Sequence, residues 1–314
     1  MGSRLIGRVA QILPTIFLVT LLVFCLQQLM PGDPAVVMAG ENRGDPVVLA
    51  QIRAELWLDR SLPVQYLHWI GNLLRGDLGI SWHTREAVTG LIGQKLPVTL
   101  QVAAMAFAIA CAIGIPAGVV AAIFRNRVLD YLASSIGLAG LSTPNFWLGI
   151  MLILLISVQA GWLPPSGFVP LTEDWRASLA TTIMPAFVLG NAIAAILMRH
   201  TRSAMLNALD QDFVRTARAK GLSETIVLVR HALGNALLPI VTLGALELGT
   251  LLSGAVLTEQ VFSIPGFGKL VVDAVFNRDY PVVQGVVLVT ACVYLLLNLI
   301  ADVLYEVIDP RLRS

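Results

Sequence analysis

Side chains that could do chemistry are sparse in this chain, and one cluster of them lies in residues 210–221. This segment holds two carboxylates, three cationic side chains and one phenylalanine, and it ends at Gly221. A glycine at this place predicts the end of a short helix, and Ser223–Leu233 is predicted to form a second helical stretch. Two short helices joined by a glycine suit docking of another protein. A basic loop lying near anionic lipid headgroups is the simpler interpretation.

Glu247 is an isolated acid inside a long apolar run. An ionised carboxylate that faces lipid at this depth costs roughly 3 kcal/mol or more, so we expect it to face the interior of a helix bundle or a water-filled path. It could form part of a substrate pathway and meet a cationic group of the cargo. It could equally be a protonated or partnered glutamate that only packs helices.

No pattern of catalytic or metal-binding residues accompanies these groups. The chain has no G-x-x-x-x-G-K-[ST] phosphate loop, no G-x-S-x-G and no H-E-x-x-H, and Gly268-Lys269 is followed by leucine. The four histidines are scattered, and the three cysteines lie in apolar runs without metal-ligand spacing. We therefore expect no catalytic residue, no metal site and no cofactor bound by this chain. The net charge of +1 gives no indication of nucleic-acid binding.

The elements that must position these residues are membrane helices. Of the 314 residues, 56% are hydrophobic and 13% are charged, whereas soluble domains carry about 25% charged residues. A membrane helix needs about 20 mostly apolar residues. The sequence predicts an all-α polytopic bundle with six spans: Val9–Met30, Val98–Phe124, Tyr131–Ala160, Thr182–Met198, Ala236–Leu257 and Val282–Val307. Pro144 in the third span and Pro185 in the fourth predict kinks or segment ends.

The segment between the first two spans is the least hydrophobic part of the chain. It contains glycine, proline and charge clusters together with short helical stretches. We expect residues 1–30 to form the amino-terminal segment and first helix, and residues 31–97 to form a small external subdomain. Residues 98–314 are then the membrane core, with a coupling loop at 199–238.

The distribution of basic residues predicts the orientation. An even number of spans places both termini on one side, which also receives the basic residues of 125–127 and 199–238. Outside the long segment 31–97, the opposite side keeps only Arg176, Lys269 and Arg278. Basic residues in short loops mark the cytoplasmic side. Both termini are therefore predicted to be cytoplasmic.

Several motifs resemble one family in the same order along the whole chain. The segment Arg215–Leu222 is similar to the coupling loop of bacterial binding-protein-dependent ABC importers, although Arg215 and Thr216 replace the usual Glu-Ala. The other motifs resemble the dipeptide/oligopeptide/nickel branch: Leu29–Pro34, Gly76–Gly79, Leu96–Leu100, Pro144–Trp147, Gly161–Pro164, Val261–Gly268, Asn277–Pro281 and Asp309–Arg311.

The resemblance implies a permease subunit that works by alternating access. Its expected partners are membrane lipid, a sister permease, two ATPase subunits that use ATP and Mg²⁺, and an external solute-binding protein. The implied location is the bacterial inner membrane. The residues implied to couple to the ATPase are Asp212, Phe213, Arg215, Thr216, Ala217, Arg218, Ala219, Lys220 and Gly221.

The cargo implied by this branch is short peptides, with a nickel chelate, glutathione or an opine-like molecule as alternatives. Two other classes of protein remain to be weighed. A membrane-embedded enzyme would need a paired catalytic set at membrane depth, which the sequence lacks. A gradient-driven transporter would carry several intramembrane acids, and Glu247 alone gives it little support.

Overall fold

The fold consists of α-helices joined by short loops. The computed structural model describes residues 2–29 and 32–308, and this part of the chain contains no β-strand, only a single antiparallel bridge between Ile80 and Ala87. The all-α prediction is therefore confirmed. The chain divides into two compact units. The first comprises Met1–Pro97 and Lys269–Leu295, and the second comprises Val98–Gly268 and Leu296–Ser314.

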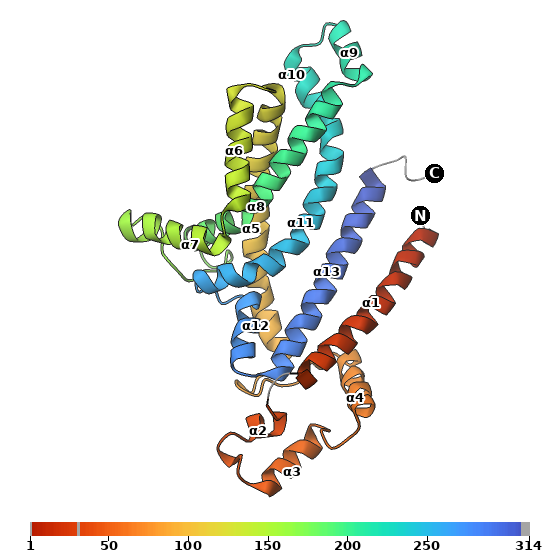
Figure 1. The fold of residues 1–314 in the computed structure, drawn as a ribbon, viewed down its shortest axis with the longest axis vertical. Coiled ribbons are helices and arrows are strands. Elements are labelled where there is room, and N and C mark those ends of the chain that lie inside the picture. Colours follow the sequence, from red (N-terminus) through yellow and green to blue (C-terminus); the bar gives the residue numbers. More distant parts are fainter. Residues whose placement is uncertain (1, 30–31, 309–314) are drawn as a thin grey trace. The chain divides into compact units, whose positions relative to one another are not determined.

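The first unit combines long apolar helices with short polar ones. Its elements are α1 (Gly2–Leu29), α2 (Pro34–Ala39), α3 (Pro46–Glu55), α4 (Leu62–Leu74), the first part of α5 (Val88–Ile123), most of α12 (Phe267–Phe276) and the first half of α13 (Tyr280–Ile308) (Figure 1). The predicted external subdomain 31–97 lies within this unit, which also includes residues 269–295. The proposed division of the chain into three parts stays a prediction.

Two aspartates determine where the first short helices begin. Asp33 Oδ1 accepts a hydrogen bond from the Ala35 amide at 2.9 Å, and Asp45 Oδ1 accepts one from the Val47 amide at 2.8 Å. Each aspartate precedes a proline at the first helical position, where the missing N–H has no helical partner to lose. The Asp-Pro pairs therefore start α2 and α3.

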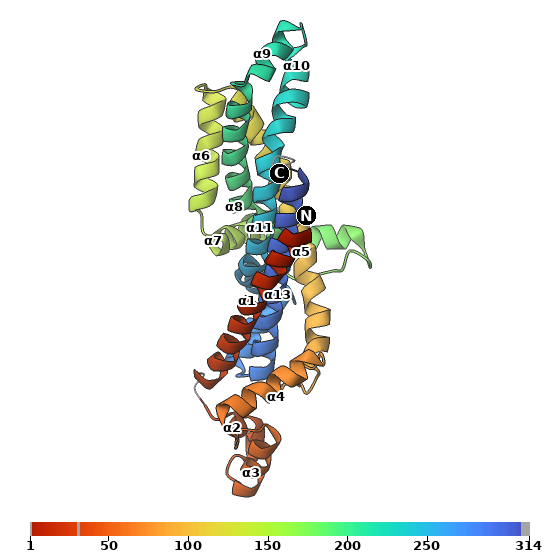
Figure 2. The ribbon, with the colours of Figure 1, turned by 90° about the vertical axis from the view of Figure 1, so that its right-hand side faces the viewer.

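The second unit is organised around α8 (Trp175–Leu209), which packs against α6 (Val128–Ser142) and α11 (Gly234–Val261). Its other elements are most of α5, α7 (Asn145–Leu152), a π-helical segment (Ile153–Gln159), α9 (Asp212–Ala219), α10 (Glu224–Ile226) and a second π-helical segment (Val227–Leu233). Both views place α9 and α10 beyond the ends of α8 and α11 (Figures 1 and 2).

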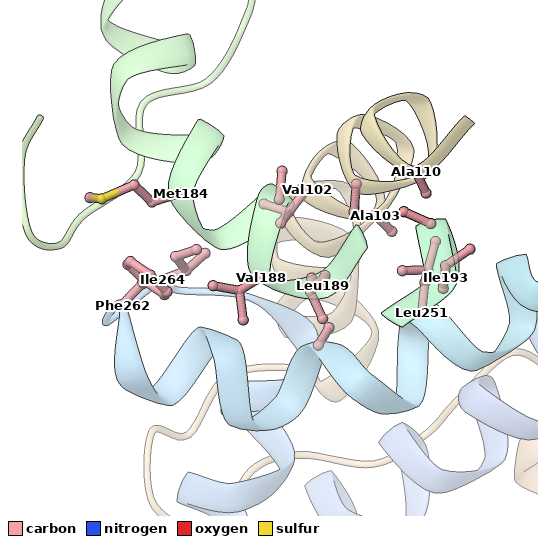
Figure 3. Close-up of a cluster of buried hydrophobic side chains, with 14 of the residues drawn as sticks. Val102, Ala103, Ala110, Met184, Val188, Leu189, Ile193, Leu251, Phe262 and Ile264 are labelled. Atoms are coloured by element: carbon pink, nitrogen blue, oxygen red, sulfur yellow. The ribbon is translucent and has the colours of Figure 1, made fainter. Parts of the chain in front are cut away.

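The core of this unit lies where α5, α8 and α11 meet. Buried side chains from α5 and α8 form one cluster with Leu251 of α11, and Phe262 and Ile264 after α11 extend this cluster beside Met184 (Figure 3). Lipid is as apolar as these side chains, so close packing rather than water exclusion must hold the helices together. Helix α6 carries several leucine and isoleucine side chains that are exposed in this chain, as expected for contact with lipid.

The number of spans is only partly tested. Val88–Ile123, Trp175–Leu209 and Tyr280–Ile300 are long and apolar enough to cross a membrane, and two bent helix pairs would raise the number to five. In α1 the apolar helix Leu13–Cys25 is shorter than this criterion requires. Six spans therefore remain a prediction.

The two prolines behave differently from each other. The predicted span Tyr131–Ala160 is broken between α6 and α7, whose axes differ by 101°, which confirms the expected break at Pro144. Pro185 neither ends nor starts a helix, because α8 begins ten residues earlier, at Trp175, and encloses it. The N-cap Asp174 accounts for the earlier start, since its carboxylate accepts hydrogen bonds from the Arg176 and Ala177 amides.

Candidate functional site

The segment singled out by the sequence forms a short helix, α9, with a defined end. Beyond its last turn the Gly221 amide donates to the Arg218 carbonyl at 2.9 Å, and the Leu222 amide donates to the Ala217 carbonyl at 3.4 Å. This pair of bonds is a Schellman motif, which requires a left-handed residue after the helix. Gly221 adopts φ +77°, so it ends α9 as the sequence predicts.

The inner face of α9 is small and apolar. Val214 and Ala217 are buried against Val227 from the second π-helical segment, and Leu209 at the end of α8 packs on the same cluster. The resemblance implied that Ala217 belongs to the surface that couples to the ATPase. It faces inward instead, so the docking face must be formed by its neighbours on the helix.

The outer face of α9 is charged around one aromatic side chain. Phe213 is 38% exposed. Arg215 Nη1 lies 3.3 Å from Asp212 Oδ1, and Arg218 donates to both carboxylate oxygens of Glu224, at 2.8 and 3.2 Å. Hydrogen bonding to Glu224 raises the pKa of the Arg218 guanidinium above its usual value. Thr216, Ala219, Lys220 and Gly221 are also exposed.

The second predicted helix is not a separate element. After α10, the chain passes through the π-helical segment Val227–Leu233 directly into α11 without a turn. The sequence has no proline or glycine between Ser223 and Gly234, and Gly234 itself is helical, with φ −54°. The coupling loop therefore contains one free-standing helix, α9, and an extension of a long helix.

One buried cluster and one ion pair lie near the base of α9 and connect the helices of the second unit. Ala122 of α5 packs in a buried cluster with Met205 and Ala208 of α8, with Ala232 of the second π-helical segment and with Ala236 of α11. One helical turn before Met205, Arg202 is paired with Asp130 of α6 at 2.6 Å. A displacement of α9 would therefore be passed to α5, α6, α8 and α11 together.

Glu247 lies on α11, away from α9. Its side chain is half-buried, and Thr250 donates hydrogen bonds to its Oε2 at 3.1 Å and to its backbone carbonyl at 2.8 Å. This local bond is compatible with both interpretations of Glu247. Among the described residues, no group of histidine, cysteine or acidic side chains is arranged to hold a metal ion.

Sequence reasoning missed two buried carboxylates that fix the second unit. Asp130 is 3% exposed, and Glu259 is fully buried, where it accepts a hydrogen bond from the Thr99 hydroxyl. The Thr99 oxygen in turn accepts from the Phe267 amide at 2.8 Å. Acids near the ends of apolar runs were the available signal, but their partners lie 72 and 160 residues away in sequence.

Known proteins resemble the chain over its full length. The family described as binding-protein-dependent transport system inner membrane component matches residues 114–314, and its amino-terminal counterpart matches residues 1–103. The di/tripeptide transport system permease protein DppB of Pseudomonas aeruginosa (strain UCBPP-PA14) is 44% identical, with 100% of this chain and 99% of that protein covered. The dipeptide transport system permease protein DppB of Escherichia coli (strain K12) is also 44% identical, with 98% of each covered.

Solved structures share the fold at lower sequence identity. An inward-facing structure of the MetNI methionine ABC transporter aligns with a TM-score of 0.58 and 18% identity. The alignment covers 70% of this chain and 96% of that chain. At this identity the likeness concerns the fold alone.

Proposed function

The chain belongs to the family of binding-protein-dependent transport system inner membrane components, and we propose that it is the permease subunit of an ATP-driven importer of short peptides. The observation that carries the proposal is the 44% identity, over the full length of both chains, to a permease named for di- and tripeptide transport. Cargo would pass from the periplasm to the cytoplasm by alternating access. Both termini and α9 would then lie in the cytoplasm.

The shape and chemistry of α9 support a role in coupling. Phe213 offers an exposed ring beside charged side chains, and this mixture suits a socket on a partner ATPase. The inner face of α9 is packed on Leu209 and Val227, so it cannot swing independently of α8 and the segment leading into α11. Closure of two ATPase subunits on ATP and Mg²⁺ would thus move the helices directly.

The proposal also includes the remaining parts of the transporter. ATP would be hydrolysed in the partner subunits, and a sister permease would complete the pathway. The external solute-binding protein would deliver the peptide. Glu247 would line the pathway at the depth where a peptide amino group passes.

Association with the ATPase subunits tests the coupling role. Arg215→Glu reverses an exposed charge on α9, and Arg75→Glu makes the same change at an exposed position after α4. We expect Arg215→Glu to reduce the amount of ATPase that co-purifies with the chain from membranes, whereas Arg75→Glu should leave it unchanged. Equal recovery of ATPase with both variants would refute the docking role.

Cargo is tested with the solute-binding protein that serves this transporter. Its melting temperature should rise with di- or tripeptides and stay constant with glutathione, a nickel chelate or an opine. Proteoliposomes containing the whole transporter should then take up the same peptides only when ATP is present inside. A rise with the nickel chelate alone, or uptake without ATP, would contradict the proposal.

A further inference from the structure

A cavity of about 520 Å³ lies within the first unit, separate from both α9 and Glu247. His68 and Trp69 line it from α4, and Trp57 lines it from the turn between α3 and α4. Trp82 and Arg85 line it from the loop before α5. Its volume falls in the range of sites that enclose small ligands. The α9 coupling role leaves this cavity without a function.

The walls of the cavity combine aromatic rings with opposite charges. The Trp57 and His68 rings stack with centroids 4.1 Å apart and planes 11° from parallel. Glu55, Asp77 and Arg85 also line the cavity. Asp77 accepts a hydrogen bond from the Gly79 amide at 2.8 Å, whereas the exposed side chains of Glu55 and Arg85 form no hydrogen bond or ion pair with any described residue. The cavity therefore presents one uncommitted anion and one uncommitted cation beside an aromatic wall.

Trp57 occupies a backbone position that normally favours glycine. The amide of Trp57 donates to the Ala54 carbonyl at 3.2 Å, and the amide of Leu58 donates to the Arg53 carbonyl at 2.8 Å, which is the Schellman pattern at the end of α3. Trp57 stands at its left-handed position with φ +59°. A bulky residue kept in this conformation points to a role for its ring.

Arg85 is held in place by an anchored loop. Asp279 is buried and accepts hydrogen bonds from the Ser81 hydroxyl at 2.5 Å and from the Trp82 amide at 3.1 Å. The Arg85 amide donates to the Ser81 carbonyl at 3.0 Å, and Arg85 itself adopts φ +62°. These bonds fix the backbone of the loop at Trp82 and Arg85, which lowers the backbone entropy lost on binding.

We propose that this cavity is a peptide-binding subsite in which Glu55 meets the free amino terminus, Arg85 meets the free carboxylate, and the Trp57–His68 wall packs on a peptide side chain. The inference rests on the proposed function, because it places the peptide cargo at a site on the permease itself. A zwitterion fits the opposite charges of Glu55 and Arg85 better than a uniformly charged ligand does. A nearby aromatic wall accepts side chains of many kinds.

Binding of trialanine to the whole transporter in nanodiscs, without the solute-binding protein, tests the subsite by calorimetry. Wild type should bind trialanine saturably. Arg85→Gln and Glu55→Gln should each weaken binding by about fivefold to tenfold. The matched controls Arg75→Gln and Glu86→Gln change exposed residues that do not line the cavity, and they should bind as wild type does.

Modified peptides assign the two termini. Trialanine amide lacks the carboxylate and should bind wild type and Arg85→Gln equally. N-acetyl-trialanine lacks the amino charge and should bind wild type and Glu55→Gln equally. Trp57→Gly removes the ring while keeping a residue that suits the left-handed backbone position, and it should weaken trialanine binding.

Several results would overturn the subsite. The first is that wild type shows no saturable binding of trialanine, and the second is that all four charge variants bind trialanine with equal affinity. The third is that Arg85→Gln also weakens binding of trialanine amide. Weaker docking of the solute-binding protein in Arg85→Gln, without any trialanine binding, would show that the cavity contacts that protein instead. ATP-dependent peptide uptake by the wild-type transporter serves as the separate readout: if it persists, only the subsite fails, and if it is absent, the proposed function fails.

Discussion

The guanidinium of Arg202 on α8 donates two hydrogen bonds to the carboxylate of Asp130 on α6, from Nε to Oδ1 at 2.6 Å and from Nη2 to Oδ2 at 2.8 Å. Asp130 also accepts from the Asn126 amide at 2.9 Å. Its side chain is 4% exposed and that of Arg202 is 29% exposed. This two-bond contact between guanidinium and carboxylate fixes the position of α6 relative to α8 near the base of α9.

Removing one partner of this pair should destabilise the second unit. Asp130→Ala leaves the Arg202 charge poorly solvated, and we expect a loss of about 3 kcal/mol in the free energy of unfolding. The loss is measured as a lower melting temperature of the purified transporter. Asp210→Ala, at an exposed position after α8, is the matched control and should melt as wild type does. Equal melting of the two variants would show that the pair adds nothing.

Gly221→Ala should loosen the end of α9. An alanine at φ +77° costs about 1 kcal/mol, and the strain acts on the turn that aligns α9. Stimulation of ATP hydrolysis by peptide-loaded binding protein should therefore fall, while the amount of transporter in the membrane stays the same. Gly234→Ala is the control, because Gly234 is helical and has open space around it. The idea fails if Gly221→Ala retains full stimulation.

Gly118→Ala should separate α5 from α8. A Cβ at this position would lie 2.5 Å from the Met198 carbonyl oxygen and 2.6 Å from Thr201 Cβ, so the helices could not keep their present distance. We expect destabilisation by about 1–3 kcal/mol, read as a lower melting temperature. Gly93→Ala lies in the same helix with nothing within 4 Å and should be neutral. A neutral Gly118→Ala would mean that the backbones can part without cost.

Features that depend on neighbouring residues could be predicted from the sequence, whereas features that depend on residues far apart in the chain could not. The end of α9 at Gly221 and the break at Pro144 follow from local backbone chemistry, and both were predicted. Ala217 is buried because Val227 packs against it, and Val227 comes into contact only after the chain has turned back at the end of α9. Arg202 was counted only as a basic residue, because nothing local reveals that Asp130 lies beside it.

Low pH should weaken the start of α2. The Arg53 guanidinium, 2.5 Å from Asp33, holds the pKa of the Asp33 carboxyl below its usual value of 3.8. Because the folded pKa is the lower one, the stabilisation is complete above pH 3.8 and is lost as the pH falls through the folded pKa. Both side chains are partly exposed, so the contribution is about 0.5 kcal/mol.

Hydrogen exchange detects this effect locally. The Val36 and Val37 amides donate to the Asp33 carbonyl, and their protection, corrected for intrinsic exchange, should fall as the pH is lowered toward 3. In Asp33→Asn the protection should be lower at pH 7 and independent of pH over this range. An identical pH dependence in Asp33→Asn would assign the change to another group.

Glu247→Gln should alter transport without disturbing assembly. The glutamine keeps an oxygen that can accept from the Thr250 hydroxyl, so the local bond at 3.1 Å can persist while the charge is removed. If Glu247 lines the path, uptake of peptides that carry a free amino group should change, because an electrostatic partner of the cargo is lost. Uptake is measured in proteoliposomes at matched amounts of transporter. Thr250→Val, which removes the hydroxyl but keeps the carboxylate, separates loss of the bond from loss of the charge. Wild-type uptake of every peptide by Glu247→Gln would leave Glu247 as a residue that only packs helices.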